Sequence, residues 1–400
     1  MPETLLTRRG FAGALSALGC LRAAAPEHRN FEMDVETRAG RDAVAGVRFH
    51  KVFEVRAGNG AREKTGSLLG LRNVYKQFTP DGQWCKLAVA VRGNNIQVRL
   101  DGMPVVDYTS PAPIERGPLT LRGPDGSFRN LRVRPLADRL ATPGPGAVED
   151  AVSRKITEAA RCQVPMVDFH VHLKLGLTLE QAIAKSLRDG IEYGIAVNCG
   201  KGFPTETDDG AREFIDSMKR QPIFVAMQAE GREWTRMFSR SVVEQFDYVF
   251  TDSMTWTDNH GRRMRTWLPE EVGAISDAQE FMDTLVERAV GILETERVNI
   301  YANPTFLPDV LAKDYETLWT DARRKKVISA AVKNHVAIEI NNRYKLPSPS
   351  FIQMAKAAGA KFTFGTNNTG PQDLGRCEYG LQMIDDCKLQ ASDFWTPQVL

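Results

Sequence analysis

Short runs that alternate between hydrophobic and polar residues occupy the first part of the chain. Gly, Asn and Asp residues of the kind found in tight turns separate several of these runs. A strand with this two-residue period buries one face and exposes the other, so a series of such strands predicts an antiparallel β-sandwich. The alternating runs are Phe31–Glu36, Leu87–Val91, Ile96–Leu100, Val105–Val106 and Leu131–Arg134.

From residue 166 onward the pattern changes to continuous hydrophobic runs, which are typical of parallel strands buried on both faces. Between most of them lie stretches in which hydrophobic residues have helical spacing. The predicted strands are Met166–Val171, Tyr193–Asn198, Ile223–Gln228, Tyr248–Thr251, Val298–Ala302, Val336–Ile340 and Lys361–Gly365. The predicted helices are Leu177–Asp189, Gly210–Lys219, Ala278–Glu294, Asp321–Lys333 and Pro349–Ala358.

This alternation of strand and helix predicts a seven-stranded barrel related to the (β/α)8 type. The chain is therefore expected to place a β-sandwich at residues 27–137 before a barrel at residues 166–400. Residues 138–165 are expected to join the two domains through the Pro/Gly-rich linker Ala141–Gly146 and a short helix at Val148–Ala160.

The composition is that of a globular protein, with 42% hydrophobic and 26% charged residues among 400. The 52 basic and 50 acidic residues leave a net charge of +2. Nucleic acid is therefore not an expected partner, because it usually selects a strongly basic surface. No run of about 18 apolar residues occurs, so no membrane span is expected.

Residues 1–26 have the three parts of a secretory signal peptide. Arg8 and Arg9 give a charged start, Phe11–Leu21 an apolar centre, and Ala23–Pro26 an end rich in small residues. The order Arg-Arg-Gly-Phe resembles a twin-arginine export signal. The expected location of the folded protein is therefore the periplasm or the outside of the cell.

Polar residues follow the hydrophobic part of each predicted barrel strand, at the end where the chemistry of such barrels collects. The most specific pattern is His170 and His172 at the end of the first strand, because a period of two places both rings on the same side. Neutral imidazoles bind Zn²⁺, Mn²⁺ or Fe²⁺, and carboxylates complete the set of ligands. The pair therefore predicts a divalent-metal site.

Other residues near the strand ends are candidates for catalysis or substrate binding. Asp252 is the expected general base, Glu339 a metal ligand or orienting group, and His260, in a predicted turn, a mobile acid. Basic side chains are expected to hold an anionic or polyhydroxyl substrate, tryptophan to line a sugar site, and asparagine to bind sugar hydroxyls. The candidate substrate-binding residues are Lys201, Arg232, Trp256, Asn303, Asn341 and Asn367.

Part of the first domain resembles the lectin-like 3-keto-disaccharide hydrolase domain. This resemblance implies a carbohydrate-facing surface, on which Trp84 is a candidate either for stacking on a sugar or for the core. The matching segments are Gly66–Gly70, Gly82–Trp84, Asn95–Val98, Asp101-Gly102 and Phe128–Val133.

The second domain resembles the polymerase-and-histidinol-phosphatase (PHP) family, whose members are distorted (β/α)7 barrels that bind up to three metals and hydrolyse phosphoesters. The resemblance implies the same distorted (β/α)7 fold and adds Glu230 as a metal ligand beside His170 and His172. The matching segments are Asp168–His172, Leu177–Asp189, Gly190–Val197, Ala337–Asn341 and Gly359–Gly365.

Four positions depart from that family's pattern. After the second strand, Asn198-Cys199 stand where the family has Asp-His, and after the fifth, Asn303 stands where it has His. After the seventh strand, Asn367–Thr369 stand where the family has Asp-x-His. Near the fourth strand, Met254 stands where a further His is expected. One cation, or at most two, is therefore expected. An amidohydrolase-like barrel, which also begins with His-x-His, is a close alternative.

The expected function is that of an exported metal-dependent hydrolase or lyase acting on a carbohydrate derivative, either a small molecule or an oligosaccharide. A site with few cations stabilises a phosphate poorly, which favours unphosphorylated sugars. The alternatives are a phosphoesterase of ordinary PHP type, an amidohydrolase-like enzyme, and a non-catalytic carbohydrate-binding protein on a decayed barrel.

Replacing both Arg8 and Arg9 with lysine is expected to leave the precursor in the cytoplasm, because the twin-arginine pathway recognises the arginine pair. Cell fractionation followed by immunoblotting measures the distribution. Normal export of the double variant would refute the twin-arginine assignment while leaving a general signal peptide possible.

Overall fold

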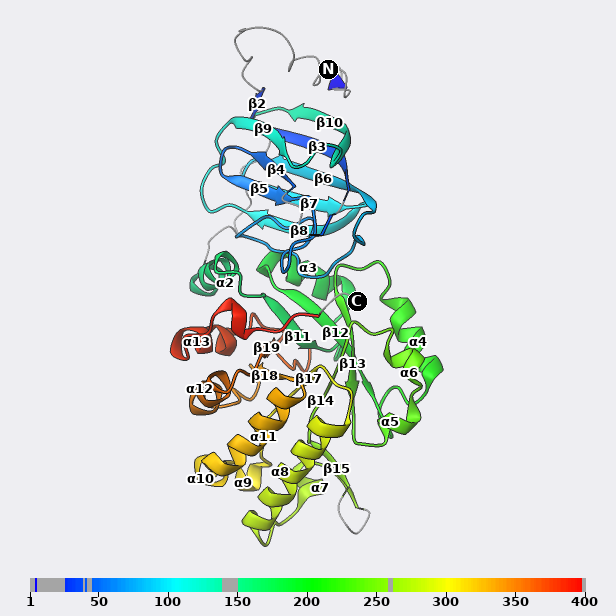
Figure 1. The fold of residues 1–400 in the computed structure, drawn as a ribbon, viewed down its shortest axis with the longest axis vertical. Coiled ribbons are helices and arrows are strands. Elements are labelled where there is room, and N and C mark those ends of the chain that lie inside the picture. Colours follow the sequence, from blue (N-terminus) through cyan, green and yellow to red (C-terminus); the bar gives the residue numbers. More distant parts are fainter. Residues whose placement is uncertain are drawn as a thin grey trace.

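Two β-rich domains follow one another along the chain (Figure 1). The computed structural model describes residues 4–5, 26–38, 40–41, 45–138, 150–257 and 262–397. A sandwich of antiparallel strands lies at the top of the view, and a barrel of parallel strands with helices around it lies below.

The sandwich consists of a six-stranded sheet in the order β1-β10-β3-β6-β7-β8 and a four-stranded sheet in the order β2-β9-β4-β5. Alternate hydrophobic residues point into the space between the sheets, so Phe31, Val47 and Val89 are almost fully buried. The strands are β1 (Thr4–Leu5), β2 (Glu27–His28), β3 (Asn30–Arg38), β4 (Gly46–Phe49), β5 (Phe53–Arg56), β6 (Trp84–Arg92), β7 (Asn95–Leu100), β8 (Met103–Thr109), β9 (Gly117–Arg122) and β10 (Phe128–Leu136).

All five strands predicted for this domain are present, so the antiparallel sandwich is confirmed. The four-stranded sheet was not predicted, because its strands are short and their alternation is brief. Trp84 is half-buried at the start of β6, where the guanidinium carbon of Arg129 lies 4.1 Å from the centre of its ring. The indole face is thus already covered by a cation.

Seven parallel strands close the barrel in the order β11-β12-β13-β14-β17-β18-β19, which confirms the seven predicted strands. Neighbouring strands pair in register over their central residues, as in Ala226 with Tyr248 and Glu339 with Thr363. The strands are β11 (Val167–Val171), β12 (Glu192–Cys199), β13 (Phe224–Ala229), β14 (Tyr248–Thr251), β17 (Ile300–Tyr301), β18 (Ala337–Asn341) and β19 (Phe362–Gly365).

Helices and strands do not alternate one for one around this barrel. Several short helices and the hairpin β15–β16 (Thr255–Thr257 and Arg263–Arg265) interrupt the pattern. The closed seven-stranded barrel with outer helices is therefore present, but the regular (β/α)7 repeat that was expected is not clear. The helices are α2 (Ala151–Arg161), α3 (Leu179–Asp189), α4 (Asp208–Ser217), α5 (Trp234–Met237), α6 (Arg240–Val243), α7 (Pro269–Val272), α8 (Ala278–Thr295), α9 (Asp309–Ala312), α10 (Tyr315–Leu318), α11 (Asp321–Lys333), α12 (Pro349–Ala357) and α13 (Glu378–Asp386).

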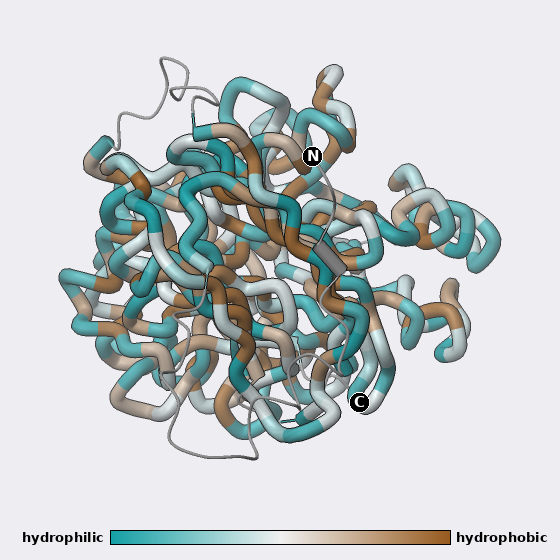
Figure 2. The backbone as a smooth tube through the Cα atoms, turned by 90° about the horizontal axis from the view of Figure 1, so that it is seen from above, coloured by the Kyte–Doolittle hydropathy of each residue, from teal (hydrophilic) through white to brown (hydrophobic). Residues whose placement is uncertain are grey.

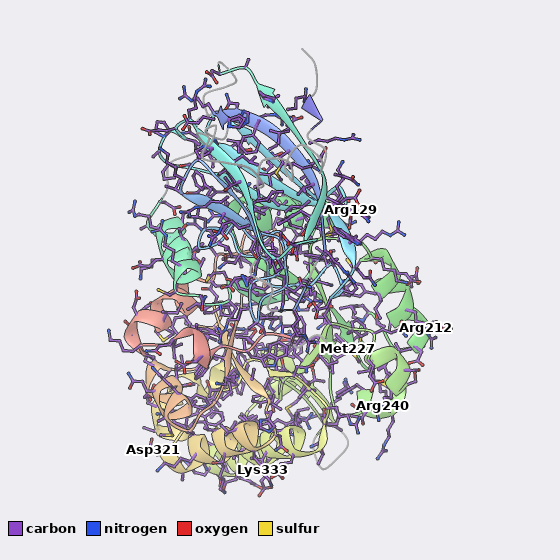
Figure 3. The ribbon with its side chains drawn as sticks, turned by 45° about the horizontal axis from the view of Figure 1, so that its top comes forward. Arg129, Arg212, Met227, Arg240, Asp321 and Lys333 are labelled. Carbon is purple, nitrogen blue, oxygen red and sulfur yellow. The ribbon has the colours of Figure 1, made fainter. Side chains whose placement is uncertain are left out.

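Hydrophobic segments run through the interior, and hydrophilic segments form much of the periphery (Figure 2). The labelled side chains in Figure 3 follow the same division: Met227 belongs to the barrel strand β13 and is fully buried, whereas Arg212 and Asp321 lie on outer helices. The barrel therefore has a packed interior, and an open site can form only where the strands end.

A loop of the sandwich docks against the barrel where several strands begin. The Oε2 atom of Glu192, the first residue of β12, accepts hydrogen bonds from the backbone N–H groups of Tyr75 (3.0 Å) and Lys76 (3.2 Å). The Tyr75 hydroxyl donates to the carbonyl of Val164 (3.0 Å), and Lys76 pairs with Asp247 (2.6 Å). The sandwich therefore covers the N-terminal ends of the strands and leaves their C-terminal ends, where the candidate residues lie, uncovered by this loop.

Most of the expected leader at 1–26 and the Ala141–Gly146 linker lie outside the described residues. Within the expected leader, Thr4–Leu5 form β1 against β10. The predicted helix after the linker is present as α2. No helix among the described residues is long and apolar enough to cross a membrane.

Glu192 is expected to make stability depend on pH. Burial raises the pKa of its carboxyl group from 4.5 to about 7. Between pH 4.5 and about pH 7, the folded state thus keeps a proton that the unfolded state has lost. The free energy of unfolding therefore falls as the pH rises through this window, by up to about 3 kcal/mol. Glu192→Gln keeps an acceptor oxygen and removes the titration, so the stability of the variant relative to wild type should increase between pH 5 and pH 8.

Urea unfolding at the two pH values measures this difference. The exposed Glu287, whose change to Gln should have no such effect, provides the control. Equal pH dependence in wild type and Glu192→Gln would show that this carboxylate is not stabilised in its protonated form.

Candidate functional site

Most of the candidate residues converge at the C-terminal ends of the barrel strands. His170 and His172 lie at the end of β11, Glu339 lies in β18, and Asp252 follows β14. These four side chains are at most 5% exposed. The structure therefore brings these four side chains together at one end of the barrel.

Both histidine rings are fixed through their Nδ1 atoms. His170 Nδ1 lies 2.6 Å from Glu339 Oε1, and His172 Nδ1 lies 3.1 Å from the carbonyl oxygen of Ala196. A carbonyl can only accept, so Nδ1 of His172 carries the proton, and the carboxylate of Glu339 imposes the same tautomer on His170. Their Nε2 atoms therefore present lone pairs.

Both Nε2 atoms are buried, and the geometry gives neither a hydrogen-bond partner within the described residues, although the side chain of Gln228 lies beside His172. The ring centroids of His170 and His172 are 5.2 Å apart. The side-chain oxygen Oε1 of Gln228, near the end of β13, is likewise buried without a partner. Buried polar atoms usually have a hydrogen-bond partner, so a group of three at one end of the barrel indicates a place for a bound water or ion.

Glu339 is the centre of the hydrogen-bond network. Besides His170, its carboxylate accepts hydrogen bonds from the backbone N–H of Asn303 (2.7 Å) and from Asn341 Nδ2 (3.0 Å). Burial alone would raise the pKa of Glu339, but the contact with His170 and these hydrogen bonds lower it below its usual value. A Cβ atom at Gly365 would lie 1.9 Å from Glu339 Oε1, so only glycine fits there.

Three asparagine side chains bind one another beside this carboxylate. Asn303 Oδ1 accepts from Asn341 Nδ2 (2.9 Å) and Asn367 Nδ2 (3.2 Å), and Asn303 Nδ2 donates to Asp252 Oδ2 (2.9 Å). Asp252 also accepts from the backbone N–H of Met254, and burial raises the pKa of its carboxyl group. The amides of Asn303 and Asn341 are thus committed to neighbours rather than open to solvent.

Glu230 occupies the end of β13 on the same side of the barrel. Its carboxylate accepts from Asn198 Nδ2 and Thr255 Oγ1, both at 2.7 Å. Burial, followed by the nearby Asp252 carboxylate, raises the pKa of Glu230 to about 8. Its expected role as a metal ligand stays a prediction, because within the described ranges no three His, Cys, Asp or Glu side chains are arranged to hold a metal.

The donor set nevertheless suits a divalent cation in part. Two neutral imidazoles present lone pairs, and each has its other nitrogen held by an oxygen, as metal-binding histidines usually do. The described residues thus offer a cation the Nε2 atoms of His170 and His172, with the side chain of Gln228 beside His172.

The remaining candidates lie away from these histidines or point elsewhere. Arg232 is paired with Glu296 (3.0 Å) and donates to Thr295 (2.9 Å) on the outer helix side. Trp256 is buried, with its ring 4.9 Å from that of Phe281. Lys201 is exposed in the loop after β12, and His260 lies outside the described residues.

Sequence reasoning did not identify Gln228 and Thr255. Gln228 ends the predicted third strand two residues before Glu230, and a two-residue period places the two side chains on the same side. That period could have indicated Gln228. Thr255 begins a hairpin that the sequence did not predict, so no comparable pattern was available.

Comparison with known proteins bears on the sandwich. Residues 16–134 match the family model described as the 3-keto-alpha-glucoside-1,2-lyase-like domain. The resemblance inferred for the first domain is thereby confirmed, and the match ends before the barrel. No curated protein matches the chain.

Several solved structures show weak likeness. A Parabacteroides distasonis protein inferred to be a glycosyl hydrolase is 17% identical, with a TM-score of 0.24 over 28% of this chain and 74% of its own. The carbohydrate binding module CBM66 from Bacillus subtilis is 13% identical, with a TM-score of 0.20 over 27% of this chain and 77% of its own. A chain of archaeal ribonuclease P with mature tRNA is 9% identical, with a TM-score of 0.31 over 56% of this chain and 90% of its own. These scores are too low to carry a fold or a function over.

Asn303→Ala is expected to destabilise the barrel by about 2–4 kcal/mol, because buried Asp252 loses a donor while Asn341 and Asn367 lose an acceptor. Alanine is also strained at the positive φ of 46° found here. Asn303→Gly loses the same hydrogen bonds without the strain and should be about 1 kcal/mol less destabilised. Urea unfolding compares the three proteins; an alanine variant as stable as wild type would contradict the network.

Proposed function

We propose that the chain is an exported carbohydrate-active hydrolase or lyase whose barrel binds a divalent cation through His170 and His172. The observation that carries this proposal is the pair of buried, partnerless Nε2 atoms, each presented by a ring that is fixed at Nδ1. The resemblance of the barrel segments to the PHP family, although four of its positions depart, supports the same assignment.

Zn²⁺, Mn²⁺ or Fe²⁺ suits two imidazole nitrogens, with Glu230 or Gln228 as an oxygen ligand. Such a cation, when bound, lowers the pKa of water and polarises a substrate oxygen. Glu339 keeps the Nδ1 proton of His170 in place, so His170 cannot turn or exchange its tautomer. Asn303 and Asn341 hold Glu339 and Asp252 in position.

Asp252 is the proposed general base. Its burial favours the protonated form, so its carboxylate takes up a proton more readily than an exposed aspartate does. The hydrogen bonds from Met254 and Asn303 fix the orientation of both oxygens. The proton comes either from attacking water, in a hydrolase, or from a carbon beside a carbonyl group, in a lyase.

A carbohydrate derivative is the proposed substrate class. The family match of the sandwich supports it. In the barrel, Asn198, Asn303 and Asn367 stand where the PHP pattern has Asp or His, which leaves fewer cations to stabilise a phosphate dianion. Because the sandwich covers the opposite strand ends, we propose that it binds sugar separately from the barrel, as an anchoring module.

A second candidate is a non-catalytic carbohydrate-binding protein. It is favoured by one observation: the amides of Asn303 and Asn341 form hydrogen bonds with each other and with the neighbouring carboxylates. These side chains are therefore occupied within the protein and not directed at a substrate. Metal analysis separates the two candidates, since the second requires no cation.

The purified protein is expected to bind about one equivalent of divalent cation, by analogy with single-metal hydrolytic sites. The double variant His170→Ala/His172→Ala should bind none, while the control His335→Asn, which removes an exposed histidine outside the site, should bind as wild type. Elemental analysis after dialysis measures the content. Undiminished metal in the double variant would place the site elsewhere.

Unphosphorylated glycosides, including 3-keto-glycosides, are expected to be turned over in preference to sugar phosphates. Asp252→Asn should lower kcat by about 10²–10⁴-fold, the usual loss for a general base, without lowering metal content. A panel of both substrate types, assayed with and without a chelator, tests this. Metal-dependent phosphate release without turnover of any glycoside would restore the phosphoesterase alternative.

A further inference from the structure

Two cations at the mouth of the barrel lack carboxylate partners. Lys174 follows His172 by two residues, and Arg343 follows Asn341 by two residues; both side chains are exposed. Neither forms an ion pair with any carboxylate in the part of the chain that the structure describes. Arg232 and Arg263, by contrast, are paired with Glu296 and Glu233.

The loop after β19 holds these two cations near each other. The side chain of Asn368 accepts from the backbone N–H of His172 (2.8 Å) and donates to its carbonyl (2.9 Å), which fixes the start of the Lys174 loop. Arg343 Nη1 lies 3.5 Å from the carbonyl oxygen of the adjacent Asn367. Lys174 and Arg343 thus flank one short segment beside the histidines.

The acidic residue of this segment does not neutralise them. Asp373 accepts hydrogen bonds from the backbone N–H groups of Thr369 and Gly370 and from the Thr369 hydroxyl (2.6 Å). Its carboxylate is therefore occupied within its own turn.

We propose that Lys174 and Arg343 form a subsite for a carboxylate group on the substrate, so that the natural ligand is an acidic sugar. This inference rests on the proposed function, because it names the substrate class for the same barrel end. A planar guanidinium and a flexible ammonium together suit a carboxylate, which accepts from both.

Charge at the mouth favours a monoanion over a phosphate dianion. The carboxylate of Glu339, whose pKa is lowered, lies at the same strand ends and offsets part of the charge of the two cations. The two cations can therefore balance the single charge of a substrate carboxylate, whereas the second charge of a phosphate dianion would be repelled by Glu339.

Isothermal titration of the full chain with D-glucuronate, D-galacturonate, D-glucose and D-glucose 6-phosphate tests the subsite. At least one uronate should bind more tightly than glucose and glucose 6-phosphate. Lys174→Gln and Arg343→Gln should each weaken its binding by about tenfold, and added salt should weaken it in wild type. Lys345→Gln, an exposed lysine on the Arg343 loop, is the matched control and should bind as wild type.

The subsite would be refuted if neither uronate bound, or if glucose bound as tightly as the uronates. It would also be refuted if glucose 6-phosphate bound more tightly than the uronates, or if both variants bound uronate as wild type does. Circular dichroism confirms that each variant is folded. Metal content, measured on the same samples, separates the two hypotheses: a protein without metal that binds uronate through Lys174 and Arg343 refutes the metal centre but keeps the subsite.

Discussion

The buried carboxylate of Glu339 is the interaction on which the barrel end depends. Burying a charge costs several kcal/mol unless hydrogen bonds compensate. Here donors from three different strands or strand ends supply that compensation: His170 in β11, Asn303 after β17 and Asn341 in β18. The same contacts fix the tautomer of His170, so one stabilising cluster also determines which nitrogen is presented to a ligand.

The docking of the sandwich leaves the strand ends that carry this site uncovered. Glu192, Val164 and Asp247 all lie where strands begin, and they bind the loop that carries Tyr75 and Lys76. In a parallel barrel these ends support stability, whereas the opposite ends carry loops that vary with function. In the proposed function, the two domains would therefore bind sugar on separate surfaces, at opposite ends of the barrel strands.

The sequence predicted the architecture better than the contacts within the site. Buried parallel strands leave continuous hydrophobic runs, so all seven barrel strands were found, while the short strands β4 and β9 were missed because brief alternation is ambiguous. Which polar groups meet depends on distances between remote segments: Glu339 and His170 are 169 residues apart. For the same reason the pairing of Arg232 with Glu296, and the mutual binding of the asparagines, could not be inferred from residue type.

X-ray absorption spectroscopy of the purified chain after loading with Zn²⁺ tests the central claim most directly, because it reports the atoms bound to the ion whatever the substrate. The account predicts a spectrum with two imidazole ligands and oxygen ligands. A zinc ion bound without imidazole, or coordinated by cysteine sulfur, would contradict the assignment of His170 and His172 as the core of the site.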